Sequence, residues 1–165
     1  MSSERPVTSA FDTARFRQVL GHFPTGVTVV TTEKDGTPYG LTVASFASLS
    51  LRPPLVLVCI EASVKSHDAI AAAGVFGVSI LAEDQADISG RFASKADDKF
   101  EGLDVRRGSL GVPLLEGAIC TIECRVATQL PGGDHSIFVG EVIAAENAEG
   151  KPLVYYRSGY RQITN

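Results

Sequence analysis

The sequence has few cysteines, no long run of apolar residues and no cluster of basic residues, and each absence disfavours a class of protein. Its three cysteines, Cys59, Cys120 and Cys124, are an odd number and form no CxxC pair, which disfavours a disulfide framework. The longest apolar run, Leu55 to Ile60, is far shorter than a membrane span. A formal net charge of −4 without a basic run disfavours binding to nucleic acid or to an anionic membrane surface.

The amino-terminal stretch MSSERPVTSAFD contains no apolar core of signal-peptide length, so we expect a cytoplasmic protein. The chain has 165 residues, of which 44% are hydrophobic. That is enough for one compact domain with a sizeable core and too little for two ordinary domains. We expect a flexible segment over residues 1–10, followed by a single domain over residues 11–165.

Three familiar site motifs are also missing. The sequence contains no GxGxxG, which disfavours a doubly wound dinucleotide fold, and no HExxH or similar spacing, so we expect no metal site. It contains no GxSxG to support nucleophilic catalysis. If residues 119–130 form a strand, Cys120 and Cys124 lie about 13 Å apart, beyond disulfide or shared-metal reach. We expect them to be buried core thiols.

The first half of the sequence predicts one helix and a hairpin. Phe16, Val19, Leu20 and Phe23 recur at helical spacing before Pro24, which predicts an amphipathic helix over residues 12–22. The β-branched run 26–33 and the run 40–45 flank a DGTP turn and predict a hairpin. Residues 55–60 predict a short strand that is buried on both faces.

The second half predicts two further short helices and three strands. Ser66 is placed to cap a helix that ends at Gly74, the strand VFGVSIL follows, and residues 84–92 predict another helix. Residues 95–111 are charged and irregular. The strands ICTIECRVATQL and HSIFVGEVIAAE are joined by PGGD, a hairpin signal, and the first of them alternates as if only one face were buried. We therefore expect a mainly β antiparallel barrel with short helices.

Three short stretches are candidates for a flavin-type site. In GLTVASFASLS the small and hydroxylated residues would let a flat ligand approach the backbone. Lys65 beside a helix amino end suits a phosphate, and His135 follows a glycine turn at a strand start. The last two also have ordinary structural interpretations: a solvated lysine beside a helix-capping Ser66, and a hydrogen-bonded histidine.

Several stretches together resemble the short-chain flavin reductase family, the reductase components of two-component flavin monooxygenases. The resemblance runs from about Phe11 to Arg161, in order and with natural spacing. It rests on FPTGVTVVTT, GLTVASFASLSLRPPLVLVCI, KSHDAI, FGVSIL, GDHSIFVGEV and PLVYYRSGYR.

The resemblance implies an FMN-binding split β-barrel, usually a homodimer, in which NADH or NADPH reduces FMN or FAD for a separate monooxygenase. It places His135 near the docking site of the nicotinamide, which makes it the candidate catalytic residue, and it lets the motif Tyr155 to Tyr160 close the pocket. Many family members carry asparagine or serine where this chain has Ala44, so only a backbone contact is expected there. The flavin contacts that it implies are Thr42, Val43, Ala44, Ser45, Ser48, Leu49, Ser50, Cys59, Lys65, Ser66 and Tyr160.

Two other interpretations share this fold. A split-barrel flavoprotein would keep FMN as a prosthetic group and reduce another substrate, and a non-enzymatic module would only bind flavin or haem. Oxidation of NAD(P)H that rises with added free flavin separates the reductase from both.

Overall fold

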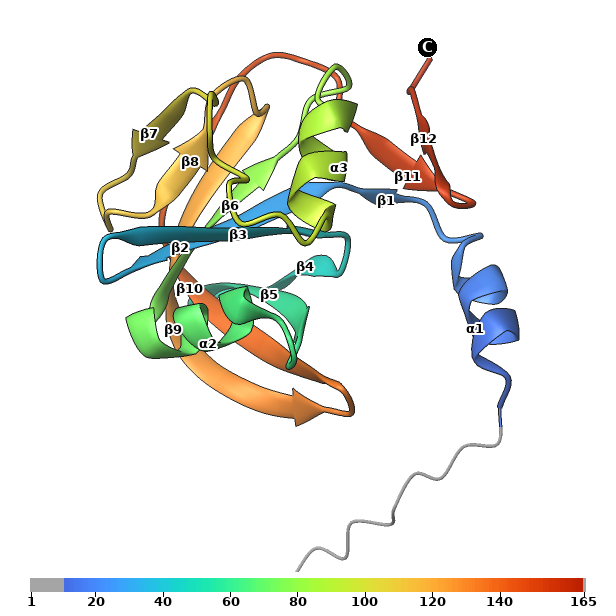
Figure 1. Cartoon of the computed structure of the whole chain (residues 1–165), viewed down its shortest axis with the longest axis horizontal. Helices are drawn as coiled ribbons and strands as arrows, with labels where there is room; N and C mark the ends of the chain where they lie inside the picture. The colour runs from blue at the N-terminus through green and yellow to red at the C-terminus, as the bar shows by residue number, and fades with distance from the viewer. Residues whose placement is uncertain (1–10, 165) are drawn as a thin grey trace, which may run out of the picture.

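The computed structural model describes residues 11–164, so the segment predicted to be flexible, residues 1–10, lies outside the described residues. Its centre is a curled sheet of seven antiparallel strands in the order β3-β2-β6-β9-β10-β5-β4 (Figure 1). These strands are β2 (Thr28–Lys34), β3 (Thr37–Val43), β4 (Phe46–Leu51), β5 (Pro54–Glu61), β6 (Val75–Ile80), β9 (Cys120–Gly132) and β10 (His135–Asn147).

The edges of this sheet decide its shape. The edge strands β3 and β4 are consecutive in the chain and only residues 44–45 separate them, yet they do not pair with each other. The sheet therefore curls into a barrel that stays split between its two edges. This arrangement confirms the mainly β fold class that the sequence predicts.

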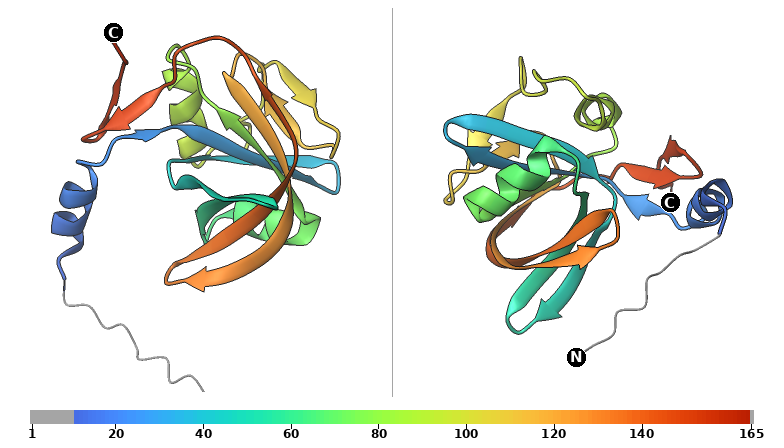
Figure 2. Two further views of the ribbon diagram at one scale, coloured as in Figure 1. Left: turned by 180° about the vertical axis from the view of Figure 1, so that it is seen from behind. Right: turned by 60° about the horizontal axis from the view of Figure 1, so that its bottom comes forward.

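The remaining elements are three helices and two small sheets. The helices are α1 (Thr13–Leu20), α2 (Lys65–Ala73) and α3 (Ala86–Ala93). The small sheets are β7 (Val105–Arg107) with β8 (Pro113–Leu115), and β1 (Thr25–Gly26) with β11 (Val154–Tyr156) and β12 (Gly159–Arg161). Helix α2 lies across one end of the barrel, between the β2–β3 hairpin and the β9–β10 ribbon (Figure 2). Among the described residues, no helix is long and apolar enough to cross a membrane.

Both predicted hairpins are present. Asp35 and Gly36 turn β2 into β3 with φ angles of 51° and 78°, which matches the positive φ that a two-residue hairpin turn requires. Gly133 begins the turn between β9 and β10 with φ 71°. The β9–β10 pairing runs from Cys120 opposite Asn147 to Gly132 opposite His135, and this turn therefore places His135 at the start of β10.

The barrel interior is filled by one apolar cluster, and a second cluster lies beneath α3. Phe76, Phe138 and Val58 are fully buried at the centre of the first cluster. Gly140 lets the strands approach there, because a Cβ at this position would lie 2.5 Å from the Phe76 ring. The buried members of the second cluster are Val27, Val29, Leu81, Phe92, Leu115 and Leu153.

Two predictions about strand burial are wrong. In β5 only alternate residues, Val56, Val58 and Ile60, are buried, whereas Leu57 and Cys59 on the other face are half-buried, because that face has no covering layer within one chain. In β9 both faces are buried in part, since Arg106 of β7 covers Thr121 and the connection between β7 and β8 covers Glu123. The Glu123 carboxylate accepts hydrogen bonds from the backbone of residues 109–110 at 2.9 Å and 2.7 Å.

Three smaller expectations also need correction. The stretch 95–111 contains the strand β7, which was not predicted because the charged residues of this stretch show no strand pattern. Helix α2 begins at Lys65 with Val64 as its N-cap, so Ser66 lies inside the helix and does not cap it, although Gly74 ends it as predicted. Cys124 is buried as expected but Cys120 is only half-buried. Burial raises the pKa of the Cys124 thiol to about 12, so it stays protonated at neutral pH.

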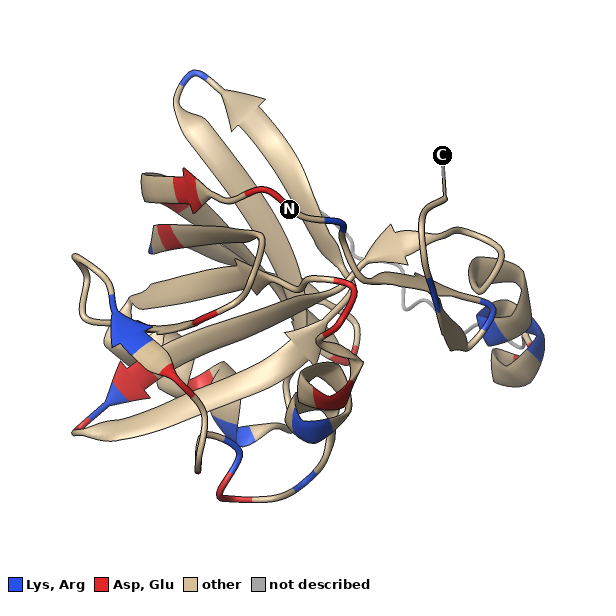
Figure 3. Cartoon of the chain, turned by 90° about the horizontal axis from the view of Figure 1, so that it is seen from above, with Lys and Arg blue, Asp and Glu red and all other residues tan. Residues whose placement is uncertain are grey.

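Helix α1 and the sheet of β1, β11 and β12 extend from the barrel, and together we call them the arm (Figure 1). Asp12 caps α1 by accepting a hydrogen bond from the backbone N–H of Ala14 at 3.0 Å. The helix is present as predicted, but none of its residues is buried. Its apolar side chains Phe16, Val19 and Leu20 are 51%, 51% and 54% exposed. Basic and acidic residues are interspersed along the ribbon of the barrel (Figure 3).

Candidate functional site

A cavity of about 930 Å³ opens at the split of the barrel. Its walls come from the β3–β4 connection, the end of β5, the start of α2, the first residue of β10 and the segment that follows α3. The lining residues are Leu41, Thr42, Val43, Ala44, Ser45, Cys59, Ile60, Glu61, Ser63, Val64, Lys65, Ser66, Phe92, Ala93, Ser94, Lys95, Ala96, Asp97, Lys99 and His135. The volume falls in the range of about 300–1,000 Å³ that is usual for small-molecule sites.

The wall formed by β3 and its connection to β4 presents backbone groups. The Thr42 hydroxyl donates to the Ser89 carbonyl at 2.6 Å, and the Ser45 hydroxyl donates to the Cys59 carbonyl at 2.9 Å. Both hydroxyl protons are therefore used within the protein, and only lone pairs remain to face a ligand. Among the described strands β3 pairs with β2 alone. The backbone N–H and C=O groups along its outer edge therefore form no hydrogen bonds to a neighbouring strand of the described chain.

The start of α2 forms a positively polarised corner of the cavity. No side chain caps this helix, and the amides of Lys65 and Ser66 have no carbonyl partner within it. Unpaired amides, the helix dipole and a lysine together favour an anionic group such as a phosphate. In this structure the Lys65 Nζ donates to the Asp97 carboxylate at 2.8 Å, although both side chains are well exposed. The hydrogen bond raises the pKa of Lys65 and lowers the pKa of Asp97.

The segment that follows α3 is held to the barrel by Lys99. Its Nζ donates to the carbonyls of Gly40 and Phe92, both at 3.2 Å, and burial lowers the pKa of this lysine. These bonds tie the far end of the segment to β3 and to α3. The segment therefore lies over the cavity with Lys95 and Asp97 in its lining.

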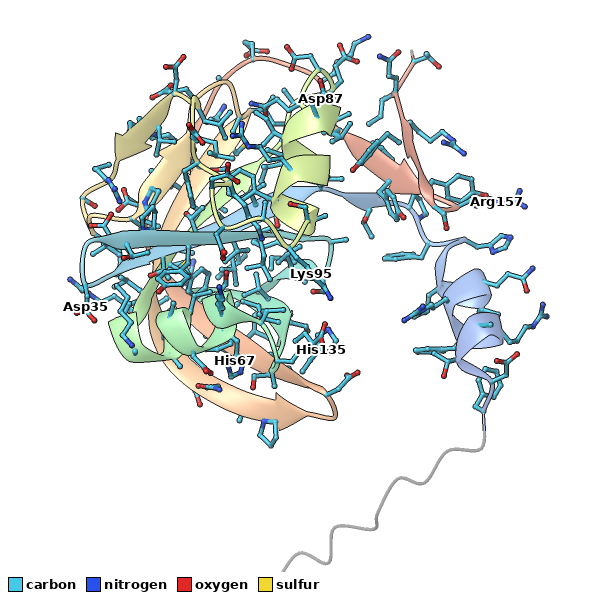
Figure 4. All side chains as sticks on the ribbon, in the orientation of Figure 1. Asp35, His67, Asp87, Lys95, His135 and Arg157 are labelled. Carbon is cyan, nitrogen blue, oxygen red and sulfur yellow. The ribbon has the colours of Figure 1, made fainter. Side chains whose placement is uncertain are left out.

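His135 faces the cavity from the first position of β10 (Figure 4). Its Nδ1 lies 2.7 Å from the Asp134 carboxylate, which is only an acceptor, so Nδ1 must carry a proton and donate. This hydrogen bond lowers the pKa of Asp134. The Nε2 atom of His135 is left to meet a ligand, as an acceptor when the ring is neutral and as a donor when it is protonated.

The structure brings together most, but not all, of the residues that the sequence suggests for the site. Those in the cavity lining are Thr42, Val43, Ala44, Ser45, Cys59, Lys65, Ser66 and His135. Ser48, Leu49 and Ser50 lie farther along β4, outside the lining. Tyr160 also lies outside it, on β12, where its hydroxyl donates to Ser89 Oγ at 2.8 Å.

Sequence reasoning missed Leu41, Ile60, Glu61, Ser63 and the segment 92–99, of which all but Asp98 line the cavity. The only local signal for that segment was its density of lysine and aspartate in a stretch without periodicity. Among residues 11–164, no three His, Cys, Asp or Glu side chains are placed to hold a metal ion.

The cavity fits a flat nucleotide. Apolar side chains such as Leu41, Val43 and Ile60 suit a ring system, the outer edge of β3 offers backbone hydrogen bonds, and the start of α2 suits a phosphate. The fold and the site together define a nucleotide-binding split barrel.

Comparison with known proteins narrows this class. Residues 20–164 match the family described as flavin reductase like domain, and the chain belongs to this family. The chain is similar to HsaB of Mycobacterium tuberculosis, the reductase subunit of a flavin-dependent monooxygenase. The identity is 44% over 160 residues, which cover 95% of this chain and 86% of the relative.

Two further relatives are, by name, enzymes that act on NADH and a flavin. An NADH-dependent flavin reductase of a Rhodococcus species is 42% identical over 150 residues, which cover 89% of this chain and 84% of the relative. The solved structure of SgcE6 from Streptomyces globisporus, an NADH:FAD oxidoreductase in complex with NAD and FAD fragments, superposes with a TM-score of 0.89. It is 38% identical, and the match covers 93% of both chains. These matches confirm the family resemblance and the split-barrel fold inferred from the sequence.

Proposed function

We propose that this flavin reductase uses NADH to reduce FAD, which it binds as a dissociable substrate, and that it supplies the reduced flavin to a separate monooxygenase. The names of the relatives support the choice of NADH and FAD and the monooxygenase partner. The structural observation that carries the proposal is the single cavity shared by the outer edge of β3, the start of α2 and His135.

The chemistry itself belongs to the two nucleotides: a hydride moves with two electrons from the dihydronicotinamide to the oxidised flavin ring, which leaves NAD⁺ and reduced flavin. The protein's part is to bind both rings, orient them and limit the access of water. We assign the flavin ring to the wall of Thr42, Ala44 and Ser45, where small side chains leave the backbone approachable. The half-buried Cys59 lies beside this wall.

The flavin phosphate is assigned to the start of α2. There the amides of Lys65 and Ser66 donate and the Lys65 ammonium supplies the positive charge. Because the Asp97 carboxylate forms an ion pair with the Lys65 ammonium, a phosphate must compete with this carboxylate. That competition suits a flavin that is released after each reduction.

His135 is assigned to the nicotinamide nucleotide. The Asp134 carboxylate fixes its Nδ1 proton and so directs Nε2 toward the ligand. The hydride carries both electrons to the flavin ring, so the transfer itself requires no proton from a protein group. The role of His135 is therefore binding and orientation.

We also propose that two copies of the chain form a homodimer through the arm. The side chains of α1 and of the β11–β12 hairpin expose apolar surface, with Phe16, Leu20, Tyr155 and Tyr160 each at least 39% exposed. Apolar side chains that gather on one helix face, as Phe16, Val19 and Leu20 do on α1, often mark a surface that a partner covers. A second copy would cover the arm with the same surface on both sides.

The test of the reductase function is steady-state NADH oxidation with and without added flavin. We expect oxidation that rises with free FAD and saturates, faster with NADH than with NADPH, and a purified protein that gives up its flavin on gel filtration. If no dinucleotide is oxidised with either FMN or FAD, the proposal fails. A tightly held flavin with no response to added FAD would favour the prosthetic-group alternative.

The role of His135 is tested by His135→Ala. Loss of one hydrogen bond, worth about 0.5–1.5 kcal/mol, should raise the KM for NADH about three- to tenfold while the flavin Kd stays nearly unchanged. Asp134→Asn provides a milder variant, because it keeps the ring but weakens the acceptor that orients it. An unchanged KM for NADH in His135→Ala would remove the residue from the nicotinamide site.

A further inference from the structure

A chain of four polar side chains joins α2 to the β9–β10 ribbon directly behind the cavity. The Nε2 atom of His67 lies 2.8 Å from Ser136 Oγ, and Nδ1 of His67 lies 2.9 Å from the Asp68 carboxylate. The Gln129 amide donates to Ser136 Oγ at 3.2 Å. His67 and Ser136 are only 8% and 9% exposed, so water competes poorly for the hydrogen bond between them, whereas the Asp68 carboxylate is exposed.

The chemistry of the partners sets the direction of each hydrogen bond. The Asp68 carboxylate can only accept, so Nδ1 of His67 donates to it, and in a neutral ring Nε2 is then an acceptor. Ser136 then donates its hydroxyl proton to His67 Nε2 while its oxygen accepts from Gln129. The two buried members, His67 and Ser136, thus have partners for their polar atoms, and the Gln129 amide nitrogen also lies 3.4 Å from His67 Nε2. The His67 ring is also held edge-on against Phe138, with centroids 5.3 Å apart.

These residues alternate along the chain with residues of the cavity. Ser136 follows His135 in β10, and His67 lies in the first turn of α2, directly after Lys65 and Ser66. Because neighbouring strand residues point to opposite faces, His135 faces the cavity while Ser136 faces α2. Figure 4 shows His67 and His135 on the same side of the molecule.

A serine, a histidine and a carboxylate in this order resemble the nucleophilic arrangement of hydrolases. Neither Ser136 nor His67 belongs to the cavity lining, however, and Ser136 is buried. A substrate would not reach the hydroxyl. The cluster is therefore better explained by what it connects.

We propose that His67 and Ser136 are positioning residues for hydride transfer. Their hydrogen bond ties the amino end of α2, which carries Lys65, to the start of β10, which carries His135. The bond thereby keeps the distance constant between the part of the site that binds flavin and the part that binds the nicotinamide. The proposal rests on the function proposed above, because only a reaction between two bound rings needs this separation to be constant.

The expected effect is on the rate of transfer and not on the binding of either ligand. When the tie is lost, each part of the site keeps its own contacts and β5 still pairs with β10 at Glu61 and His135. Helix α2, which begins four residues after Glu61, can then shift against β10. A displacement of about 1 Å between reacting groups can slow a reaction by up to about a hundredfold. Since a lost tie loosens the geometry without removing it, we expect a reduction of about tenfold.

The experiment compares Ser136→Ala with Ser79→Ala by single-turnover stopped flow at saturating FAD and NADH. Ser79 is a matched control, because it is fully buried in β6 and its hydroxyl accepts from the Leu115 amide at 3.1 Å, remote from the cavity. Both variants should lose some thermal stability. Only Ser136→Ala should lose about tenfold in hydride-transfer rate, with a flavin Kd within about twofold of the wild-type value.

His67 provides the second pair of variants. His67→Phe keeps the aromatic packing and removes the hydrogen bonds, so it should slow transfer as Ser136→Ala does, and the double variant should be no slower than either single one. His67→Gln can still accept from Ser136 and should recover part of the rate. In the ligand-free protein, exchange of the hydrogen-bonded amides of α2, from His67 onward, should be faster in Ser136→Ala and unchanged in Ser79→Ala.

The outcomes separate the two proposals. A transfer rate unchanged in both Ser136→Ala and His67→Phe would reduce the cluster to ordinary stabilisation and overturn the inference. Weaker ligand binding with an unchanged rate would also overturn it. Wild-type protein that transfers no hydride would overturn the proposed reductase function instead, and the exchange measurement would still report whether the tie holds α2.

Discussion

The apolar side chains inside the barrel are buried, whereas those of α1 in the arm are exposed. Inside the barrel Phe76, Val58 and Phe138 are fully buried by strands of the same chain. In the arm, α1 has the periodicity of a packed helix but no buried residue. Hydrophobic periodicity therefore predicts that a helix has an apolar face, but not whether the same chain covers that face.

The cavity lies between these two extremes. One of its walls is the rigid barrel, formed by the ends of β3 and β5, and the other is the exposed segment after α3. Substitutions at the barrel, the arm, the rigid wall and the exposed wall should thus differ in what they disturb: folding, association, ligand entry or ligand release.

The largest effect is expected inside the barrel. Phe76→Ala removes a fully buried ring and should cost about 3–5 kcal/mol in the free energy of unfolding, because it leaves a cavity in a close-packed core. For a chain of this size that lowers the Tm by about 10–15 °C. Leu51→Ala, at a side chain that is 89% exposed, is the control and should change the free energy of unfolding by less than about 0.5 kcal/mol. Calorimetry or denaturant unfolding measures both, and equal losses would contradict the contrast between core and surface.

The arm should respond in association and not in folding. Leu20→Asp places a charge on the apolar face of α1 and should convert a dimer to single chains of 17.4 kDa at micromolar concentration. Light scattering measures the mass, and circular dichroism should show an intact barrel. Leu130→Asp is the matched control, since that leucine is also exposed but lies near the tip of the β9–β10 hairpin. A wild-type protein that is already monomeric, or a Leu20→Asp variant that stays dimeric, would remove the arm from the interface.

The rigid wall of the cavity should control ligand entry. Ser45→Leu puts a branched side chain beside the approachable backbone and should weaken flavin binding by about tenfold or more, because overpacking a fitted site costs about 1–3 kcal/mol. Ser50→Leu makes the same chemical change on β4 outside the cavity lining and should leave the flavin Kd unaltered. Fluorescence titration of FAD measures both. Equal weakening by the two variants would show that the flavin extends along β4.

The exposed wall should have the smallest effect, and in the opposite direction. Asp97→Asn removes the carboxylate that pairs with Lys65 and should tighten flavin binding about two- to threefold at low salt, since an exposed ion pair is weak. Asp98→Asn changes the net charge equally and serves as the control. The gain should shrink as salt is added, because salt screens exposed charges. Flavin binding that is unchanged by Asp97→Asn would mean that Asp97 does not compete with the phosphate.

Local patterns in the sequence predicted much of the fold. The DG and GG turns required positive φ at Gly36 and Gly133, and these turns determine both hairpins and the place of His135. Burial was predicted less well. The alternating pattern of β9 predicted that Thr121 and Glu123 lie on an exposed face. Both are buried, because β7 and the connection that follows it cover them, and the pattern within β9 does not indicate this contact.

The candidate site divides in the same way. Lys65, His135 and the stretch from Thr42 to Ser45 could be suggested from the sequence, since a small-residue wall, a helix start and a glycine turn are local features. The placement of Asp97 against Lys65 and the tie from His67 to Ser136 could not, because these partners are 32 and 69 residues apart. The sequence by itself determined which residues turn, alternate and carry chemistry, since these are properties of neighbouring residues. Only the tertiary structure decided which of them meet, because closing the barrel brings together strands and helices that no short-range preference relates.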